Sequence, residues 1–204
     1  MKKQNLIILS IFFLFACQNK LDKNVNQKNN DSQGINKENC NFDRFLKDEK
    51  VPKFAKELYQ NNYKLNSDEP LSILEKLEST DKQERMFYFR VITNSYKISD
   101  GAYSEGLGNV GKEYIENKTK EFAEYFDSKD CFSDEDLKTW AKITVLEFEI
   151  IDENIESGEK ESLVSIYSKD LISKSKKFPK NQKETILKFT NFLKLEWKEF
   201  LRYT

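Results

Sequence analysis

The chain has 204 residues, with 34 Lys and Arg, 35 Asp and Glu, and no His. The absence of His excludes Ser-His-Asp and Cys-His catalysis and removes the commonest metal ligand, and a pI near 5.8 argues against nucleic-acid binding. With only six Gly and three Pro, but 16 Phe, nine Tyr and many Lys and Glu, the composition predicts an all-α protein with an aromatic core.

The chain begins with the pattern of an export signal. Lys2 and Lys3 precede an apolar run from Leu6 to Phe15 that only Ser10 interrupts. A basic start, a short apolar run and small residues before a cleavage point are typical of a secretory signal. A run of about 10 apolar residues is too short for a membrane-spanning helix, which needs roughly 20.

The end of this run, Leu14-Phe15-Ala16-Cys17, resembles the lipobox of bacterial lipoproteins. The resemblance implies that residues 1–16 are a signal peptide and that Cys17 is acylated, becomes the mature N-terminus and holds the chain at a lipid bilayer. In the lipoproteins that the chain resembles, an Asp directly after the cysteine marks retention in the inner membrane. Gln18 occupies that position here, which favours the outer membrane, facing the periplasm. The alternative is an ordinary cleaved signal, with Cys17 discarded or left as a free thiol.

Residues 18–40 are rich in Asn, Gln and Lys and contain only three large aliphatic side chains. Such a composition cannot form a core, so we expect residues 17–40, including the lipidated cysteine, to be a disordered tether. A flexible coil of this length has a root-mean-square reach of roughly 25 Å. The tether would therefore hold a single helical domain, residues 41–204, clear of the bilayer.

Apolar residues recur at helical spacing through residues 42–201. Start signals are predicted at Val51-Pro52, at Asp68-Glu69-Pro70, at Thr80 or Asp81 with Glu84 as a capping box, and at Ser133-Asp134-Glu135-Asp136. Between them we expect helices around 42–46, 52–59, 71–77, 86–98, 102–117, 119–126, 137–151, 163–172 and 186–201, some of which can run together. About seven or eight helices would form a compact bundle or a short HEAT-like α-α superhelix.

Cys40 and Cys131 are the two cysteines that remain beside Cys17. An even number of cysteines in an oxidising compartment favours a disulfide. Closing a loop of about 90 residues would stabilise the fold by roughly 4–5 kcal/mol in the chain-entropy description. The alternative is two buried thiols without a bond.

Three short patterns suggest chemistry, and each has a simpler explanation. Residues 106–111 spell G-x-G-x-x-G, but no strand precedes them, so close helix packing explains these glycines better than nucleotide binding. Glu147, Glu149, Asp152, Glu153 and Glu156 could line a hydrolytic or calcium site, although a solvated helix end is commoner. Ser173 and Lys176 match a serine–lysine spacing that arises readily in a chain rich in both residues.

Tyrosines between residues 88 and 125 are the remaining candidates, because Tyr is enriched at binding interfaces. Core packing would explain most of them. The residues that could form such an interface are Tyr96, Tyr103, Glu105, Glu113, Tyr114 and Glu116. Charge is also uneven, with 18 Lys and Arg against 28 Asp and Glu in residues 41–168, and 10 against 4 in residues 169–204. The basic end would either pack beside acidic helices or face phosphate-rich lipid or an acidic partner.

These features together favour a membrane-tethered, non-enzymatic envelope domain that binds another protein. In this character the chain is similar to the small exported all-helical lipoproteins that include immunity proteins against antibacterial effectors, which implies an acidic docking face around residues 100–160. The alternatives are a cell-envelope hydrolase that uses the clustered carboxylates, and a structural or assembly lipoprotein of an envelope complex. We expect no cofactor, no metal and no nucleic acid, and a protein partner in addition to the bilayer.

Overall fold

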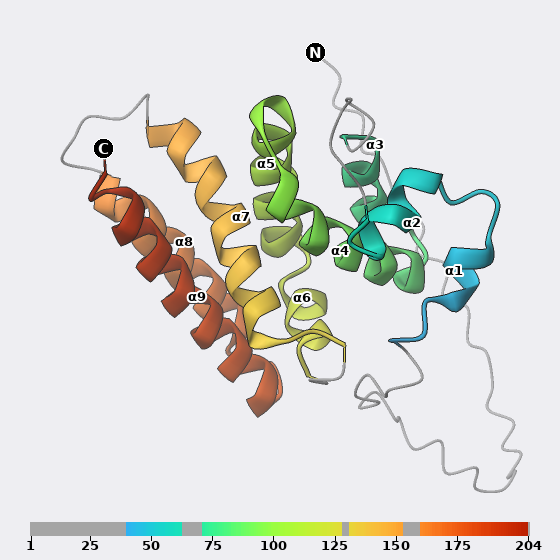
Figure 1. The fold of residues 1–204 in the computed structure, drawn as a ribbon. Coiled ribbons are helices and arrows are strands. Elements are labelled where there is room, and N and C mark those ends of the chain that lie inside the picture. The colour runs from blue at the N-terminus through green and yellow to red at the C-terminus, as the bar shows by residue number, and fades with distance from the viewer. Residues whose placement is uncertain (1–39, 63–70, 128–130, 153–159, 204) are drawn as a thin grey trace, which may run out of the picture. The chain divides into compact units, whose positions relative to one another are not determined.

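The computed structural model describes residues 40–62, 71–127, 131–152 and 160–203. These residues form nine α-helices and no β-strand, which confirms the all-α prediction (Figure 1). The helices are Asp43–Lys47 (α1), Lys53–Tyr59 (α2), Leu71–Leu74 (α3), Lys82–Ser95 (α4), Gly101–Asn117 (α5), Thr119–Tyr125 (α6), Asp134–Asp152 (α7), Lys160–Ser175 (α8) and Lys180–Phe200 (α9). The predicted signal peptide, Cys17, the predicted tether before Cys40 and the predicted start signal at residues 68–70 lie outside the described residues.

Three predicted helix starts are present, one of them in a different form. Helix α2 begins at Lys53, directly after Val51-Pro52. At α7, the Ser133 N–H donates to Asp136 Oδ2 over 2.7 Å and the Asp136 N–H donates back to Ser133 Oγ over 3.2 Å, which is a reciprocal capping box. At α4, Asp81 accepts from the Gln83 N–H over 2.8 Å. Glu84 accepts instead from the Ser79 hydroxyl, so the expected bond from Glu84 back to the cap is replaced by a contact to the preceding turn.

The helix count exceeds the expected seven or eight for local reasons. Lys118 adopts φ −122° and ψ 37°, which ends α5, and α6 begins at Thr119. The Thr119 hydroxyl donates to the Ile115 carbonyl over 2.8 Å, so the carbonyl at the end of α5 gains a partner at the break. Leu71–Leu74 forms one α-turn that tightens into the 3-10 segment Glu75–Glu78 (η2).

The core is centred on the contact between α4 and α7. Met86, Phe87, Tyr88 and Phe89 are consecutive and all buried, as expected of a helix that is apolar on most sides. The Phe89 ring stacks on Trp140 of α7 with centroids 4.1 Å apart. The Trp140 indole N–H donates to Thr93 Oγ1 over 2.8 Å, so the polar atom that this tryptophan carries into the core has a partner.

Helix α5 crosses α7 at the glycines of the G-x-G-x-x-G pattern, and this is the most extensive contact between two helices of the described residues. A Cβ on Gly108 would lie 2.8 Å from the Glu147 backbone nitrogen, and a Cβ on Gly111 would lie 2.5 Å from Ile143 Cγ2. The pattern therefore lies inside a helix and serves close packing, as the simpler explanation predicted, and the strand that a dinucleotide fold requires before it is absent from residues 71–105.

Helix α7 packs between α5 and α9, and α9 also contacts α6 and α8 (Figure 1). The contact of α6 with α9 joins helices three apart in the chain, beyond the next helix pair, whereas each unit of a superhelix contacts only the next. The arrangement is therefore a bundle. No helix within the described ranges has the length and apolarity to span a membrane.

A disulfide joins Cys40, just before α1, to Cys131, just before α7. The two Cα atoms are 5.5 Å apart and the residues are separated by 91 positions in sequence. The Cys131 carbonyl accepts a hydrogen bond from Arg90 of α4, and Arg90 also pairs with Asp136 over 2.9 Å. The disulfide predicted from the cysteine count therefore lies next to contacts that hold the start of α7 in position.

Candidate functional site

Two of the three tyrosines predicted at an interface are core residues. Tyr103 is 5% exposed and its hydroxyl lies 2.5 Å from Ser95 Oγ, while Tyr114 is 1% exposed. Burial raises the pKa of Tyr103 to about 12 and raises that of Tyr114 well above its ordinary value. This placement corrects the interface prediction at Tyr103 and Tyr114, because buried rings cannot offer surface to a partner.

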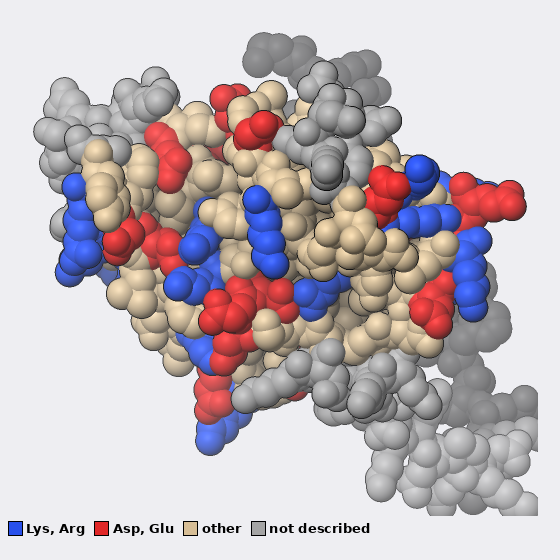
Figure 2. All heavy atoms as spheres, viewed as in Figure 1, with Lys and Arg blue, Asp and Glu red and all other residues tan. Residues whose placement is uncertain are grey.

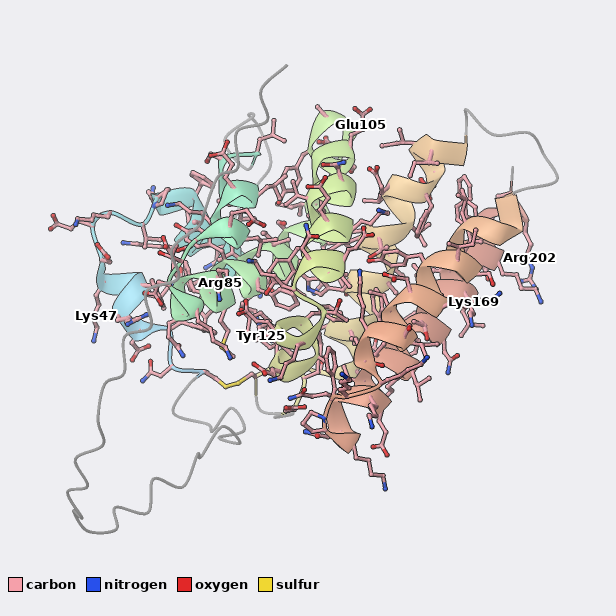
Figure 3. All side chains as sticks on the ribbon, turned by 180° about the vertical axis from the view of Figure 1, so that it is seen from behind. Lys47, Arg85, Glu105, Tyr125, Lys169 and Arg202 are labelled. Carbon is pink, nitrogen blue, oxygen red and sulfur yellow. A yellow bond between two sulfur atoms is a disulfide. The ribbon has the colours of Figure 1, made fainter. Side chains whose placement is uncertain are left out.

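Tyr114 belongs to a buried polar cluster that the sequence did not reveal. The hydroxyls of Tyr114 and Tyr125 each donate to Glu121 Oε1 over 2.9 Å. Arg85 of α4 donates to the same carboxylate over 2.7 and 2.5 Å, and Figure 3 shows Arg85 and Tyr125 close together. Burial opposes ionisation of Glu121, but the three donors outweigh it and lower the pKa of the carboxyl.

In this Glu121 cluster, Arg85, Tyr114 and Tyr125 all donate hydrogen bonds to one carboxylate. Each hydroxyl donates to the carboxylate, and the hydrogen bond to Glu121 raises the pKa of Arg85, with burial opposing it. The fork geometry of Arg85 matches the carboxylate with two parallel bonds. The cluster therefore joins α4, α5 and α6 and explains two of the tyrosines as structural residues.

The three predicted glutamates lie on α5. Glu105 and Glu113 are exposed, and Figure 3 shows Glu105 near the N-terminal end of the helix. Glu116 is half-buried and pairs with Lys112 over 3.0 Å. Tyr96, in the 3-10 segment Tyr96–Ile98 (η3), lines a hollow of about 230 Å³ with residues of α7 and the end of α9, and none of the three glutamates lines it. The structure does not bring the predicted set together.

The hollow beside Tyr96 adjoins a second one of about 450 Å³. Lys142, Glu196 and Glu199 line both, so the two form a continuous surface between α7 and α9. Leu195 lines one hollow and is 62% exposed, and Tyr203 lines the other and is 83% exposed. We name these residues, with Tyr96 and Glu149, the α7–α9 surface.

The α7–α9 surface carries charges of both signs: Lys138, Lys142, Lys198 and Arg202 line the larger hollow, and Glu149, Glu196 and Glu199 lie with Lys142 around the hollow at Tyr96. Burial and the neighbouring carboxylates of Glu196 and Glu149 raise the pKa of Tyr96. Burial also raises the pKa of Glu149, which makes no ion pair within the part of the chain that the structure describes. Lys138 pairs with Glu196 over 3.6 Å. Apolar area beside incompletely compensated carboxylates is suited to binding rather than to packing within the domain.

The predicted carboxylate group is divided. Glu147 is half-buried beside the glycine crossing of α5, and Glu149 faces α9 in the α7–α9 surface. Glu153 and Glu156 lie outside the described residues, and so does the side chain of Asp152. Among described side chains, no three or more of His, Cys, Asp and Glu are grouped in a way that could hold a metal ion. Ser173 and Lys176 are both exposed at the end of α8.

The basic and acidic parts of the chain meet, as one of the two explanations of the charge pattern requires. Lys188 of α9 pairs with Asp134 of α7, and Lys138 of α7 pairs with Glu196 of α9. Figure 2 shows basic and acidic side chains interspersed over the face that it draws. Lys194 and Lys198 of α9 differ, since neither forms an ion pair with any residue that the structure describes.

The periodicity of α9 could have revealed part of the α7–α9 surface. Its buried residues Ile186, Phe189, Leu193 and Trp197 are three or four positions apart. Leu195 falls outside this spacing, so the periodicity predicts that it is exposed, as it is. The participation of Tyr96 with α9 has no such sequence signal, because the two segments are about 100 residues apart in the chain.

Comparison of the chain with protein-family models, with curated proteins and with solved structures finds no match.

Proposed function

We propose that this protein is a lipid-anchored component of the bacterial cell envelope whose helical domain binds another protein without catalysing a reaction. The α7–α9 surface carries the proposal. It places the exposed side chain of Tyr203 with Tyr96 and with Glu149, which has no ion pair within the described ranges, and the exposed side chain of Leu195 in the adjoining hollow. Apolar anchors surrounded by charges of both signs are typical of protein-binding surfaces.

Two further observations support the envelope location. The residues Leu14–Cys17 resemble a lipobox, and Gln18 favours the outer membrane, facing the periplasm. The Cys40–Cys131 disulfide suits an exported protein, because disulfides persist in oxidising compartments and are rare where thiols are kept reduced. Acylated Cys17 would hold the domain at the bilayer, where the partner would be another envelope protein.

Site-specific crosslinking tests the binding surface. A photo-crosslinking amino acid is placed at Leu195 or Tyr203 in the full chain with native Cys17, and at Lys47 of α1 as an exposed control. We expect the same protein to crosslink from positions 195 and 203 but not from 47, and Glu149→Lys to lower the yield about tenfold. Mass spectrometry identifies the partner, and a toxin would establish an immunity-like role. Equal crosslinking from all three positions would contradict the proposal.

Labelling with a palmitate analogue tests the anchor separately. The wild-type chain should incorporate label and fractionate with the outer membrane. Cys17→Ser should abolish the label, whereas Cys40→Ser should leave it unchanged. Labelling that survives Cys17→Ser would refute the lipobox assignment and leave the binding surface to be judged by crosslinking.

A further inference from the structure

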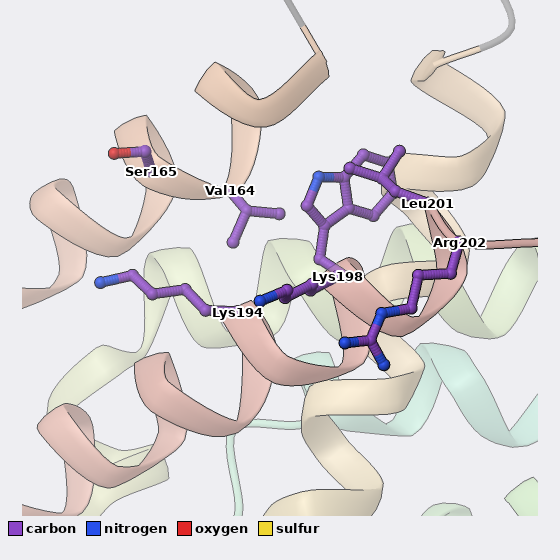
Figure 4. Close-up of a pocket in the computed structure, with 7 residues that line it drawn as sticks. Val164, Ser165, Lys194, Lys198, Leu201 and Arg202 are labelled. Atoms are coloured by element: carbon purple, nitrogen blue, oxygen red, sulfur yellow. The ribbon is translucent and has the colours of Figure 1, made fainter.

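A second groove, of about 530 Å³, lies between α8 and α9 and shares Lys198 and Arg202 with the larger hollow of the α7–α9 surface (Figure 4). One wall is a row of cations, Lys194, Lys198 and Arg202, spaced four residues apart. Residues four apart lie about 6 Å from one another along a helix, so the three form a single ridge. Figure 4 shows this ridge across from Val164 and Ser165 of α8.

The charge of this basic groove is not neutralised by its lining. No Asp or Glu is among the described residues that line it. Arg202 reaches Glu199 at 3.5 Å in an exposed contact, while Lys194 and Lys198 have no ion-pair partner in the described ranges. Exposed cations held together in a concave site repel one another, and an anion that binds between them relieves this repulsion.

The apolar part of the groove holds an unused hydrogen-bond donor. Trp197 lines the groove together with Val164 and Leu201, and it is only 4% exposed. Its indole Nε1 is buried and has no hydrogen-bond partner among the residues described. A buried donor without a partner costs roughly 1–3 kcal/mol. The contrast with Trp140, whose indole N–H donates to Thr93, shows that this fold can pair a buried indole.

We propose that the basic groove binds the phosphate headgroup of an anionic lipid. Lys194, Lys198 and Arg202 would pair with the phosphate, the Trp197 indole would donate to a headgroup oxygen, and Val164 and Leu201 would contact the first carbons of the acyl chains. A volume of about 530 Å³ is in the range of small-ligand sites. The choice of a lipid rests on the membrane anchorage proposed above, since anchorage at Cys17 would keep the groove in contact with a high local concentration of headgroups.

The two tryptophans allow a direct test on the full chain in a neutral detergent. Dihexanoyl phosphatidylglycerol is titrated while the two indole N–H signals are followed by NMR. We expect the Trp197 signal to move with saturation and the Trp140 signal to stay in place. Dihexanoyl phosphatidylcholine should require at least tenfold higher concentrations. This titration does not depend on acylation, so its failure and a failure of the palmitate test can be told apart.

A matched pair of variants separates the groove from the general basic charge. Lys194→Gln with Lys198→Gln and Lys176→Gln with Lys177→Gln each remove two positive charges from the basic C-terminal part of the chain. Each Lys near an anionic headgroup contributes about fivefold, so the first pair should weaken binding by roughly 10- to 30-fold. The second pair should weaken it less than twofold. Circular dichroism confirms that both variants fold.

Four results would overturn the proposal. Equal weakening in both variants would mean that only the overall charge attracts the lipid, and a Trp140 shift equal to that of Trp197 would mean a general response to the additive. Inorganic phosphate acting at the same concentration as the lipid would indicate a free-anion site. A hexaglutamate peptide that moves the Trp197 signal at lower concentration than the lipid would identify an acidic protein as the occupant.

Discussion

Glu121 is the acidic residue with the most hydrogen-bond partners that the structure describes, and it accepts from Arg85, Tyr114 and Tyr125. Glu121→Gln preserves the shape of this side chain but leaves the Arg85 cation, 12% exposed, without its counter-ion. We expect the free energy of unfolding to fall by about 2–4 kcal/mol. Urea denaturation at pH 7 measures the change.

The exposed pair between Lys82 and Glu124, 2.7 Å apart, provides the control. The Lys82 side chain is 47% exposed, so Lys82→Gln should cost less than about 1 kcal/mol. Equal losses of unfolding free energy in Glu121→Gln and Lys82→Gln would contradict the inference that the buried Glu121 contributes more than an exposed ion pair. We expect the two losses to differ because water screens the exposed Lys82–Glu124 pair and is excluded from most of the Arg85–Glu121 pair.

The same residue predicts a pH dependence. The pKa of Glu121 is lowered in the folded state, so its stabilising contribution is complete above the ordinary carboxyl value of about 4.5 and is lost as the pH falls through the lowered pKa. The stability difference between wild type and Glu121→Gln should therefore shrink when the pH is reduced from 6 to 3. A difference that stays constant over this range would refute the prediction.

The wild type has to be compared with Glu121→Gln because other carboxyl groups change the folding stability with pH in the opposite direction. Burial raises the pKa of Asp127 and of Glu149. Such groups bind more protons in the folded state, so falling pH stabilises the fold through them. The total pH profile combines both signs, whereas the difference between wild type and Glu121→Gln isolates Glu121.

At the scale of elements, the crossing of α5 and α7 depends on two glycines. A Cβ at Gly108 would collide with the α7 backbone at Glu147, and one at Gly111 would lie 2.5 Å from the branched Ile143. We expect Gly108→Ala and Gly111→Ala each to lower the free energy of unfolding by about 1–3 kcal/mol, because overpacking exceeds the roughly 1 kcal/mol that Ala contributes to helix propensity. Thermal and urea unfolding measure the change.

Gly106 of the same helix is the matched control. A Cβ there would lie 3.0 Å from Leu71 Cδ2 and 3.3 Å from Leu74 Cδ1, which are ends of flexible side chains. Gly106→Ala should therefore be neutral or stabilise by up to about 1 kcal/mol. Destabilisation of the same size at positions 106, 108 and 111 would show that helix packing does not explain the glycines.

Helix positions were the most predictable feature of the chain, since their signals are local. The acids after Ser133 predicted the start of α7, and Asp134, Glu135 and Asp136 lie in its first turn. The break between α5 and α6 was less certain from sequence, because Lys118 has no intrinsic tendency to end a helix. Contacts of Thr119 and Phe122 in the bundle determine it.

At the scale of the whole domain, the disulfide is the longest-range covalent constraint. It joins residues 91 positions apart, so it should stabilise by about 4–5 kcal/mol through the unfolded state. We expect Cys40→Ala with Cys131→Ala to lower the urea midpoint accordingly. A reductant should lower that of the wild type by a similar amount and leave the double variant unchanged. A wild type whose stability is unaffected by full reduction would contradict this account.

The burial and the neighbours of the candidate site residues could not be predicted from the sequence. Tyr96, Tyr103 and Tyr114 look alike in sequence, yet one lines a surface hollow and two are buried. Glu149 was a candidate member of a carboxylate site, with a solvated helix end as the commoner explanation, and the structure places it in the α7–α9 surface with Glu196 and Glu199 of α9. Burial and neighbourhood depend on segments far along the chain, and hydrophobic periodicity carries no information on which helix covers which face.

By itself, the sequence determined the helical class, the main helix starts, the packing role of the glycines and the pair of cysteines that bond. Each of these depends on local backbone propensities or on a count of rare residues. The tertiary structure alone decided that Glu121 gathers Arg85 and two tyrosines, that Tyr203 lines a hollow with Tyr96, and that Trp197 lies beside three cations. Such groupings arise when helices from distant parts of the chain bury their apolar faces together, which places polar groups side by side without any signal in the local sequence.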